Sequence, residues 1–145
     1  MKIYLDFDGT LVEHQYPKIG RCNFSSVEIV RKLQDAGHEV ILNTMRCEFN
    51  NGSLGEAKRW LDNAWMVVKN RRELGREFKL DPIYPTPYKV QPVWDWDFFQ
   101  REGVIFIDDQ AHGTPLKKAV MTEGYMVDWE ELDKIFTEKG IYKIN

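Results

Sequence analysis

The sequence has little cysteine: Cys22 and Cys47 stand alone, with no CxxC spacing. Two isolated cysteines exclude a disulfide scaffold and favour reduced thiols, with a single disulfide between them as the minor alternative. No apolar run approaches the roughly 20 residues that a membrane-spanning helix needs. Asp6 introduces charge too early for a secretory signal. We therefore expect a cytoplasmic protein with no membrane partner.

The sequence also lacks an excess of charge of either sign. It contains 20 Lys and Arg against 23 Asp and Glu residues, a net charge of −3. This balance disfavours a broad nucleic-acid surface, although it does not exclude a local basic patch. Repeats and low-complexity segments are absent, and 43% of the residues are apolar. A chain of this size and composition predicts one domain over residues 1–145 with its own core.

Short apolar segments alternate with helical periodicities along the chain. This alternation predicts βαβ units, and hence an α/β fold with a mainly parallel sheet and helices on both faces. Ser25 and Ser26 are the candidate N-caps of the first helix, and Gly37 is its expected end. The residues between 64 and 80 fit either a helix or a strand. The expected strands are 3–7, 38–43, 104–107 and 125–127; the expected helices are 25–37, 54–62, 94–101 and 129–139; the expected loops are 12–23 and 81–92.

Acidic residues follow two of the predicted strands directly. Asp6 and Asp8 come after the first strand, and Asp108 and Asp109 come after the apolar run VIFI. Ligands of parallel α/β sheets bind beyond the carboxyl ends of the strands. Carboxylates gathered there repel one another unless a cation neutralises them. Four carboxylates supply oxygen ligands in a number that suits Mg²⁺, and Mg²⁺ in turn suits phosphate chemistry.

The segment DFDGTL at residues 6–11 resembles the first motif of the haloacid dehalogenase (HAD) superfamily of phosphohydrolases. The family's other motifs have counterparts in the same order. Thr44 follows the apolar run VIL as the second motif, and VIFIDD supplies the acidic pair of the fourth. Lys89, 19 positions before Asp108, is the candidate third-motif lysine, with Lys69 and Lys79 as alternatives.

The resemblance implies a role for each matching residue. Asp6 would be the nucleophile that forms an aspartyl-phosphate, and Asp8 the general acid and base. Asp8 would have to be protonated near neutral pH, which neighbouring negative charge favours. Thr44 and Lys89 would bind the transferring phosphoryl group. The implied Mg²⁺ ligands are Asp6, Asp8 through its backbone carbonyl, Asp108 and Asp109. With aspartate at position 8, the motif resembles that of the phosphatase and phosphotransferase branch of the superfamily, and not that of the dehalogenase branch.

The spacing between motifs leaves no room for a cap domain. Only 38 positions separate Asp6 from Thr44, and the predicted flap, about residues 9–23, and the first helix fill them. The chain therefore resembles the capless branch, with a three-layer α/β/α Rossmann-like core. The flap residues His14, Lys18 and Arg21 are candidates for recognising the leaving group. We expect Arg46 at the rim of the site, either contacting a substrate phosphate or forming a structural ion pair.

Other interpretations stay open at this stage. Asp6 and Asp8 also fit a plain Asp-Gly turn. The aromatic residues between Trp94 and Phe99 fit core packing or a subunit contact, and also a platform for stacking a ring. We predict a Mg²⁺-dependent phosphomonoester hydrolase acting on a small phosphorylated substrate. The alternatives are a nucleic-acid end-processing phosphatase, a phosphotransferase, and a non-catalytic binding module of the same fold; a homo-oligomer is compatible with each.

Overall fold

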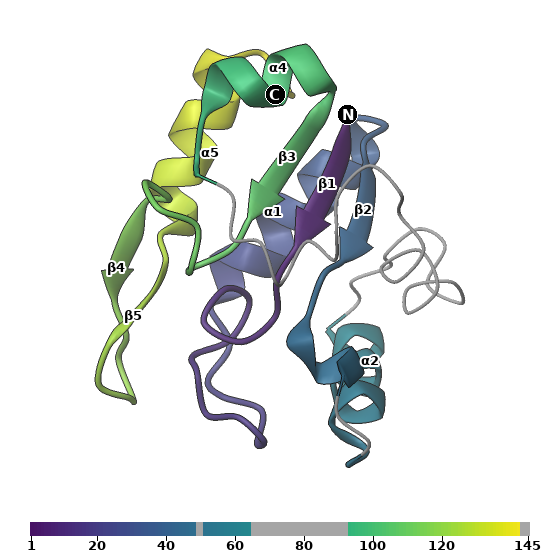
Figure 1. Ribbon diagram of the computed structural model, residues 1–145, viewed down its shortest axis with the longest axis vertical. Coiled ribbons are helices and arrows are strands. Elements are labelled where there is room, and N and C mark those ends of the chain that lie inside the picture. Colours follow the sequence, from purple (N-terminus) through teal and green to yellow (C-terminus); the bar gives the residue numbers. More distant parts are fainter. Residues whose placement is uncertain (49–50, 65–92, 143–145) are drawn as a thin grey trace.

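The computed structural model describes residues 1–48, 51–64 and 93–142 of the chain (Figure 1). Its centre is a three-stranded parallel sheet with the strand order β2–β1–β3. These strands are β1 (Lys2–Leu5), β2 (Glu39–Leu42) and β3 (Val104–Ile107). The prediction of an α/β fold with a parallel sheet is therefore confirmed.

The register of the sheet aligns the ends of its strands. Leu5 of β1 lies opposite Leu42 of β2 and Ile107 of β3. All four residues of β3 are buried, as the unalternated run VIFI predicts for a strand that is covered on both faces. The three carboxyl ends consequently reach the same edge of the sheet, where the loop after β1 also lies (Figure 1).

The described residues form four α-helices and one short 3-10 helix. They are α1 (Phe24–Asp35), η1 (Met45–Glu48), α2 (Ser53–Asn63), α4 (Trp96–Glu102) and α5 (Trp129–Glu138). Helices α1 and α5 are joined by an ion pair between Lys32 and Asp133 at 3.4 Å and a hydrogen bond from Ser25 to Glu130 at 3.0 Å. None of the described helices has the length and apolar character of a membrane-spanning segment.

The first helix begins earlier than the sequence suggests. Asn23 is its N-cap, and the Asn23 side chain accepts a hydrogen bond from the Ser25 backbone N–H at 3.1 Å. The prediction of Ser25 or Ser26 as the cap is therefore wrong. The Ser26 hydroxyl donates instead to the carbonyl of Asn23 at 2.6 Å. Three polar residues within four positions, Asn23, Ser25 and Ser26, all favour a helix start, and only the backbone path decides among them.

Beyond the main sheet, β4 (Leu116–Lys118) and β5 (Tyr125–Val127) form an antiparallel pair. The expected strand at 125–127 is present, but its partner was not predicted. The segment LKK carries two lysines and no apolar alternation, so it gives no strand signal. This hairpin extends away from the main sheet on the side of the loop after β1 (Figure 1).

The aromatic residues around α4 pack into the core. Phe99 is fully buried and makes edge-on contacts with Trp94, Trp96 and Phe98, with ring centroids 5.0, 6.4 and 6.3 Å apart. Of the interpretations that the sequence left open for these aromatic residues, the structure therefore shows core packing. The predictions for residues 65–92, including the loop at 81–92 and the lysine candidates, lie outside the described residues.

Candidate functional site

Three carboxylates meet at the carboxyl edge of the sheet. The Asp6 backbone N–H donates to the Ile107 carbonyl at 2.9 Å, which extends the β1–β3 pairing by one residue and sets Asp6 beside Asp108. One oxygen from each of Asp6, Asp108 and Asp109 lies within 4.8 Å of the other two. The acidic convergence expected from the strand ends is therefore present for these three residues.

The turn after β1 is shaped to admit Asp109. Gly9 has a φ of +79°, and a Cβ atom built on it would lie 2.3 Å from Asp109 Oδ2. Thr10 connects the two strand ends, because its hydroxyl donates to Asp6 at 3.2 Å and accepts from the Asp109 N–H at 3.3 Å. Thr10 was not predicted as a site residue, although it lies within the DFDGTL motif.

Burial and the repulsion between neighbouring carboxylates raise the pKa of two members of the cluster, Asp6 and Asp108. Burial raises the pKa of Asp6 well above its ordinary value, and the charges of Asp108 and Asp109 raise it further. Burial also raises the pKa of Asp108 to about 6, against the opposing hydrogen bond from the Gln110 N–H. A divalent cation would relieve this repulsion, so the cluster has the charge and the oxygen donors of a metal site.

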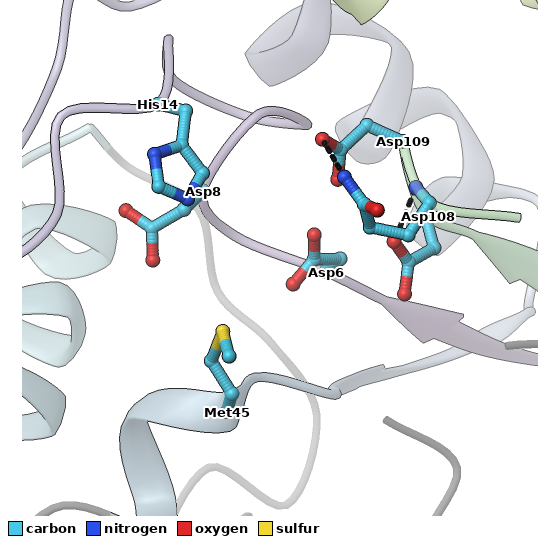
Figure 2. A pocket seen from close by; sticks show the side chains of 7 residues that line it. Asp6, Asp8, His14, Met45, Asp108 and Asp109 are labelled. Carbon is cyan, nitrogen blue, oxygen red and sulfur yellow. Dashed lines mark hydrogen bonds between the residues drawn. The ribbon is translucent and has the colours of Figure 1, made fainter. Parts of the chain in front are cut away.

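A cavity of about 300 Å³ opens beside the cluster. Figure 2 shows Asp6 at its centre, with Asp108 and Asp109 on one side and Asp8 and His14 on the other. The described residues that line it are Asp6, Asp8, His14, Met45, Asp108, Asp109 and Gln110. Sequence reasoning missed Met45 and Gln110, which carry no catalytic signature and gain their position only by following β2 and β3.

Asp8 has a different partner from the one expected. Its side chain is 5% exposed and is not part of the carboxylate cluster among the described residues. Both Asp8 oxygens accept hydrogen bonds from Arg46, each at 2.7 Å. The neighbour of Asp8 is therefore the Arg46 cation, whereas the expected general-acid role relied on neighbouring negative charge. The expected position of Arg46 at the rim is wrong, since its side chain is fully buried, and the ion-pair alternative holds.

Thr44 follows β2 by two positions and is buried. Its hydroxyl accepts a hydrogen bond from the Arg46 backbone N–H at 3.2 Å, so it helps to shape the start of η1. Thr44 is not among the described residues that line the cavity. Lys89 and its alternatives, Lys69 and Lys79, lie outside the described residues.

Of the three flap candidates for leaving-group recognition, His14 lines the cavity. Arg21 instead pairs with the buried Glu13 carboxylate at 3.7 Å. Lys18 is exposed, and its backbone carbonyl accepts from Arg46 at 3.0 Å. The flap therefore presents one of these three side chains to the cavity.

The C-terminal part of the chain supports the turn that carries the acidic residues. The Val127 N–H donates to the Gly9 carbonyl at 3.0 Å. The Trp129 indole N–H donates to the Thr10 carbonyl at 2.8 Å, and both groups are buried. The turn after β1 is thus fixed by residues more than a hundred positions later, at the end of β5 and the start of α5.

Comparisons with known proteins identify a similar fold. No protein family and no curated protein matches the chain. A solved structure of a conserved protein from Bacteroides thetaiotaomicron is similar, with 25% sequence identity and a TM-score of 0.58. The match covers 96% of this chain and 91% of that one, so the likeness extends over nearly the whole of both proteins.

Proposed function

We propose that this protein is a Mg²⁺-dependent phosphomonoester hydrolase of the capless HAD type, with Asp6 as the nucleophile. The observation that carries the proposal is the cluster of Asp6, Asp108 and Asp109, with donor oxygens within 4.8 Å of one another beside a cavity. The DFDGTL segment supports it, since its first aspartate is the residue at the centre of that cavity. The parallel sheet is compatible with the three-layer core that we propose for this family.

The donor set fits Mg²⁺ better than a softer metal. Three carboxylates supply hard oxygen ligands, and no cysteine or histidine belongs to the cluster among the described residues. Asp6, Asp108 and Asp109 would hold the ion, and Asp8 would add its backbone carbonyl. Bound there, Mg²⁺ would offset the negative charge of the incoming phosphoryl group.

The side chains of the cavity divide the remaining work. Asp6 would attack phosphorus to form an aspartyl-phosphate, and the bond from phosphorus to the leaving oxygen would break, with that oxygen taking a proton from solvent water. Thr10 would orient the Asp6 carboxylate. With both oxygens accepting from Arg46, Asp8 is held as a fixed acceptor and suits the activation of the water that hydrolyses the intermediate. His14, Met45 and Gln110 would contact the leaving group.

Phosphate release tests this proposal directly. We expect turnover of an aryl phosphate with MgCl₂ and its loss with EDTA, and a panel of sugar phosphates, nucleotides, phosphopeptides and phosphorylated oligonucleotides would identify the leaving group. Transfer of the phosphoryl group to an added alcohol would indicate a phosphotransferase. Salt-sensitive turnover of phosphorylated oligonucleotides would indicate a nucleic-acid phosphatase. A protein that binds Mg²⁺ but releases no phosphate from any of them would be a binding module.

The raised pKa values predict that Mg²⁺ stabilises the protein in a pH-dependent way. A folded pKa of about 6 for Asp108, against about 4 when unfolded, means that protonation favours the metal-free fold. That contribution is complete below about pH 4 and is lost as the pH rises through about 6. Mg²⁺ binds the deprotonated carboxylates. We expect saturating MgCl₂ to raise Tm by about 5–10 °C near pH 8 and by under about 1 °C near pH 5.

Differential scanning fluorimetry with MgCl₂ or EDTA measures this shift. Asp108→Asn should abolish it, whereas Asp97→Asn on the exposed side of α4 should retain it in full. An equal rise in Tm at both pH values, or an unchanged rise in Asp108→Asn, would place the ion elsewhere.

A further inference from the structure

Every N–H donor of the Arg46 guanidinium has an acceptor within the protein. Nε and Nη2 each donate to Asp8 at 2.7 Å. Nη2 also donates to the Lys18 carbonyl at 3.0 Å, and Nη1 donates to the carbonyls of Pro17 at 3.2 Å and Ser53 at 3.1 Å. A guanidinium group has five such donors. Arg46 therefore has no donor left for a substrate phosphate.

The acceptors of Arg46 belong to three separate segments. Asp8 lies in the turn after β1, Pro17 and Lys18 lie in the flap, and Ser53 begins α2. Aromatic rings add to the same connection: the guanidinium carbon lies 5.1 Å from the ring centroids of Phe7, next to β1, and of Tyr16, in the flap. The buried guanidinium thus joins the flap to the sheet edge.

The flap has further anchors on either side of His14. The buried Glu13 carboxylate accepts from the backbone N–H groups of Val120, Met121 and Thr122 at 3.0, 2.7 and 2.9 Å. These bonds outweigh the effect of burial and lower the Glu13 pKa. On the other side of His14, Asn51 donates to the Tyr16 hydroxyl at 2.7 Å. His14 is therefore held between two fixed points of the chain.

We propose that Arg46 is a positioning residue that fixes the Asp8 carboxylate and the flap as one unit, so that the flap is a permanent wall of the cavity. Its catalytic part rests on the proposed phosphatase function; its structural part does not. Arg46 acts through Asp8 and through the position of His14, and it makes no contact with the phosphoryl group. A lysine at this position keeps the charge but has three donors on a single nitrogen, which cannot reach all three segments.

Limited proteolysis tests the structural part without any turnover. The flap contains two trypsin sites, after Lys18 and after Arg21. In the metal-free protein, Arg46→Lys should accelerate cleavage at these sites by about tenfold or more, because cleavage follows the population of the open flap. Arg59→Lys, on the exposed side of α2, should match the wild type. Mass spectrometry of the fragments identifies the sites.

A second variant keeps this test decisive if Arg46→Lys does not fold. Asp8→Asn leaves Arg46 in place but removes the charge that holds it, and it should accelerate flap cleavage to a smaller extent. Cleavage at the wild-type rate in whichever of these variants folds would overturn the proposal, as would equal acceleration in Arg59→Lys.

Steady-state kinetics tests the catalytic part. With an aryl phosphate and Mg²⁺, Arg46→Lys should lower kcat by about tenfold or more, with KM and the inhibition constant of inorganic phosphate changed by less than about twofold. A rise in both constants would mean that Arg46 binds the phosphoryl group, and the positioning role would be wrong. If the wild type releases no phosphate while Arg46→Lys frees the flap, the proposed function fails and the structural role of Arg46 stands.

Discussion

Replacing Asp6 by asparagine is expected to reduce Mg²⁺-dependent phosphate release by about 1,000-fold or more. An amide has neither the charge nor the nucleophilic oxygen needed to form an aspartyl-phosphate. The fold should survive, because the substitution removes one of three carboxylates that repel one another. In the metal-free protein near neutral pH, we therefore expect the Tm of Asp6→Asn to equal or exceed that of the wild type.

Two measurements on the same preparation check this result: phosphate release from an aryl phosphate, and thermal unfolding with EDTA. Asp97→Asn is the matched control, because it makes the same chemical change on the exposed side of α4. It should leave both turnover and Tm as they are. Wild-type turnover in Asp6→Asn would refute the nucleophile assignment. An unfolded variant would refute the expectation that removing one of the three mutually repelling carboxylates leaves the fold intact.

The second large effect concerns the buried pair of Asp8 and Arg46. Arg46→Met should lower the free energy of unfolding by about 3–5 kcal/mol, because it leaves the Asp8 carboxylate in the interior without its cation. Three backbone carbonyls, those of Pro17, Lys18 and Ser53, also lose their donor. Such a loss is a large share of the total stability of a domain of this size.

Urea denaturation of a double-mutant cycle measures this effect. The cycle comprises Asp8→Asn, Arg46→Met and the double variant, and the double variant should lose less than the sum of the two single losses. Arg59→Met serves as the surface control and should change stability by less than about 0.5 kcal/mol. Additive losses would show that the two side chains do not stabilise each other.

The sequence predicted the parts of this molecule that follow from short-range patterns. The apolar runs gave the three strands of the parallel sheet, and parallel strands bring their ends together. The convergence of Asp6 with Asp108 and Asp109 therefore followed from their positions directly after strands. The roles of these residues in catalysis stay predictions.

The same short-range patterns do not predict the contacts that long side chains make. Arginine at position 46 fits a rim as well as an interior, and only the three-dimensional path of the flap supplies its acceptors. Nothing in the sequence singles out Glu13, because the backbone N–H groups that donate to its carboxylate lie more than a hundred residues away in the β4–β5 connection. Strand β4 was missed for a related reason: its pairing with β5, not its own composition, makes it a strand.

The support that Val127 and Trp129 give to the turn after β1 has a consequence for biosynthesis. Residues at the beginning of the polypeptide depend on hydrogen bonds from residues translated more than a hundred codons later. A nascent chain that has reached only β2 also leaves one edge of β1 unpaired until β3 emerges from the ribosome. The acidic cluster therefore forms late, and the proposed metal site is complete only after Trp129 has been synthesised.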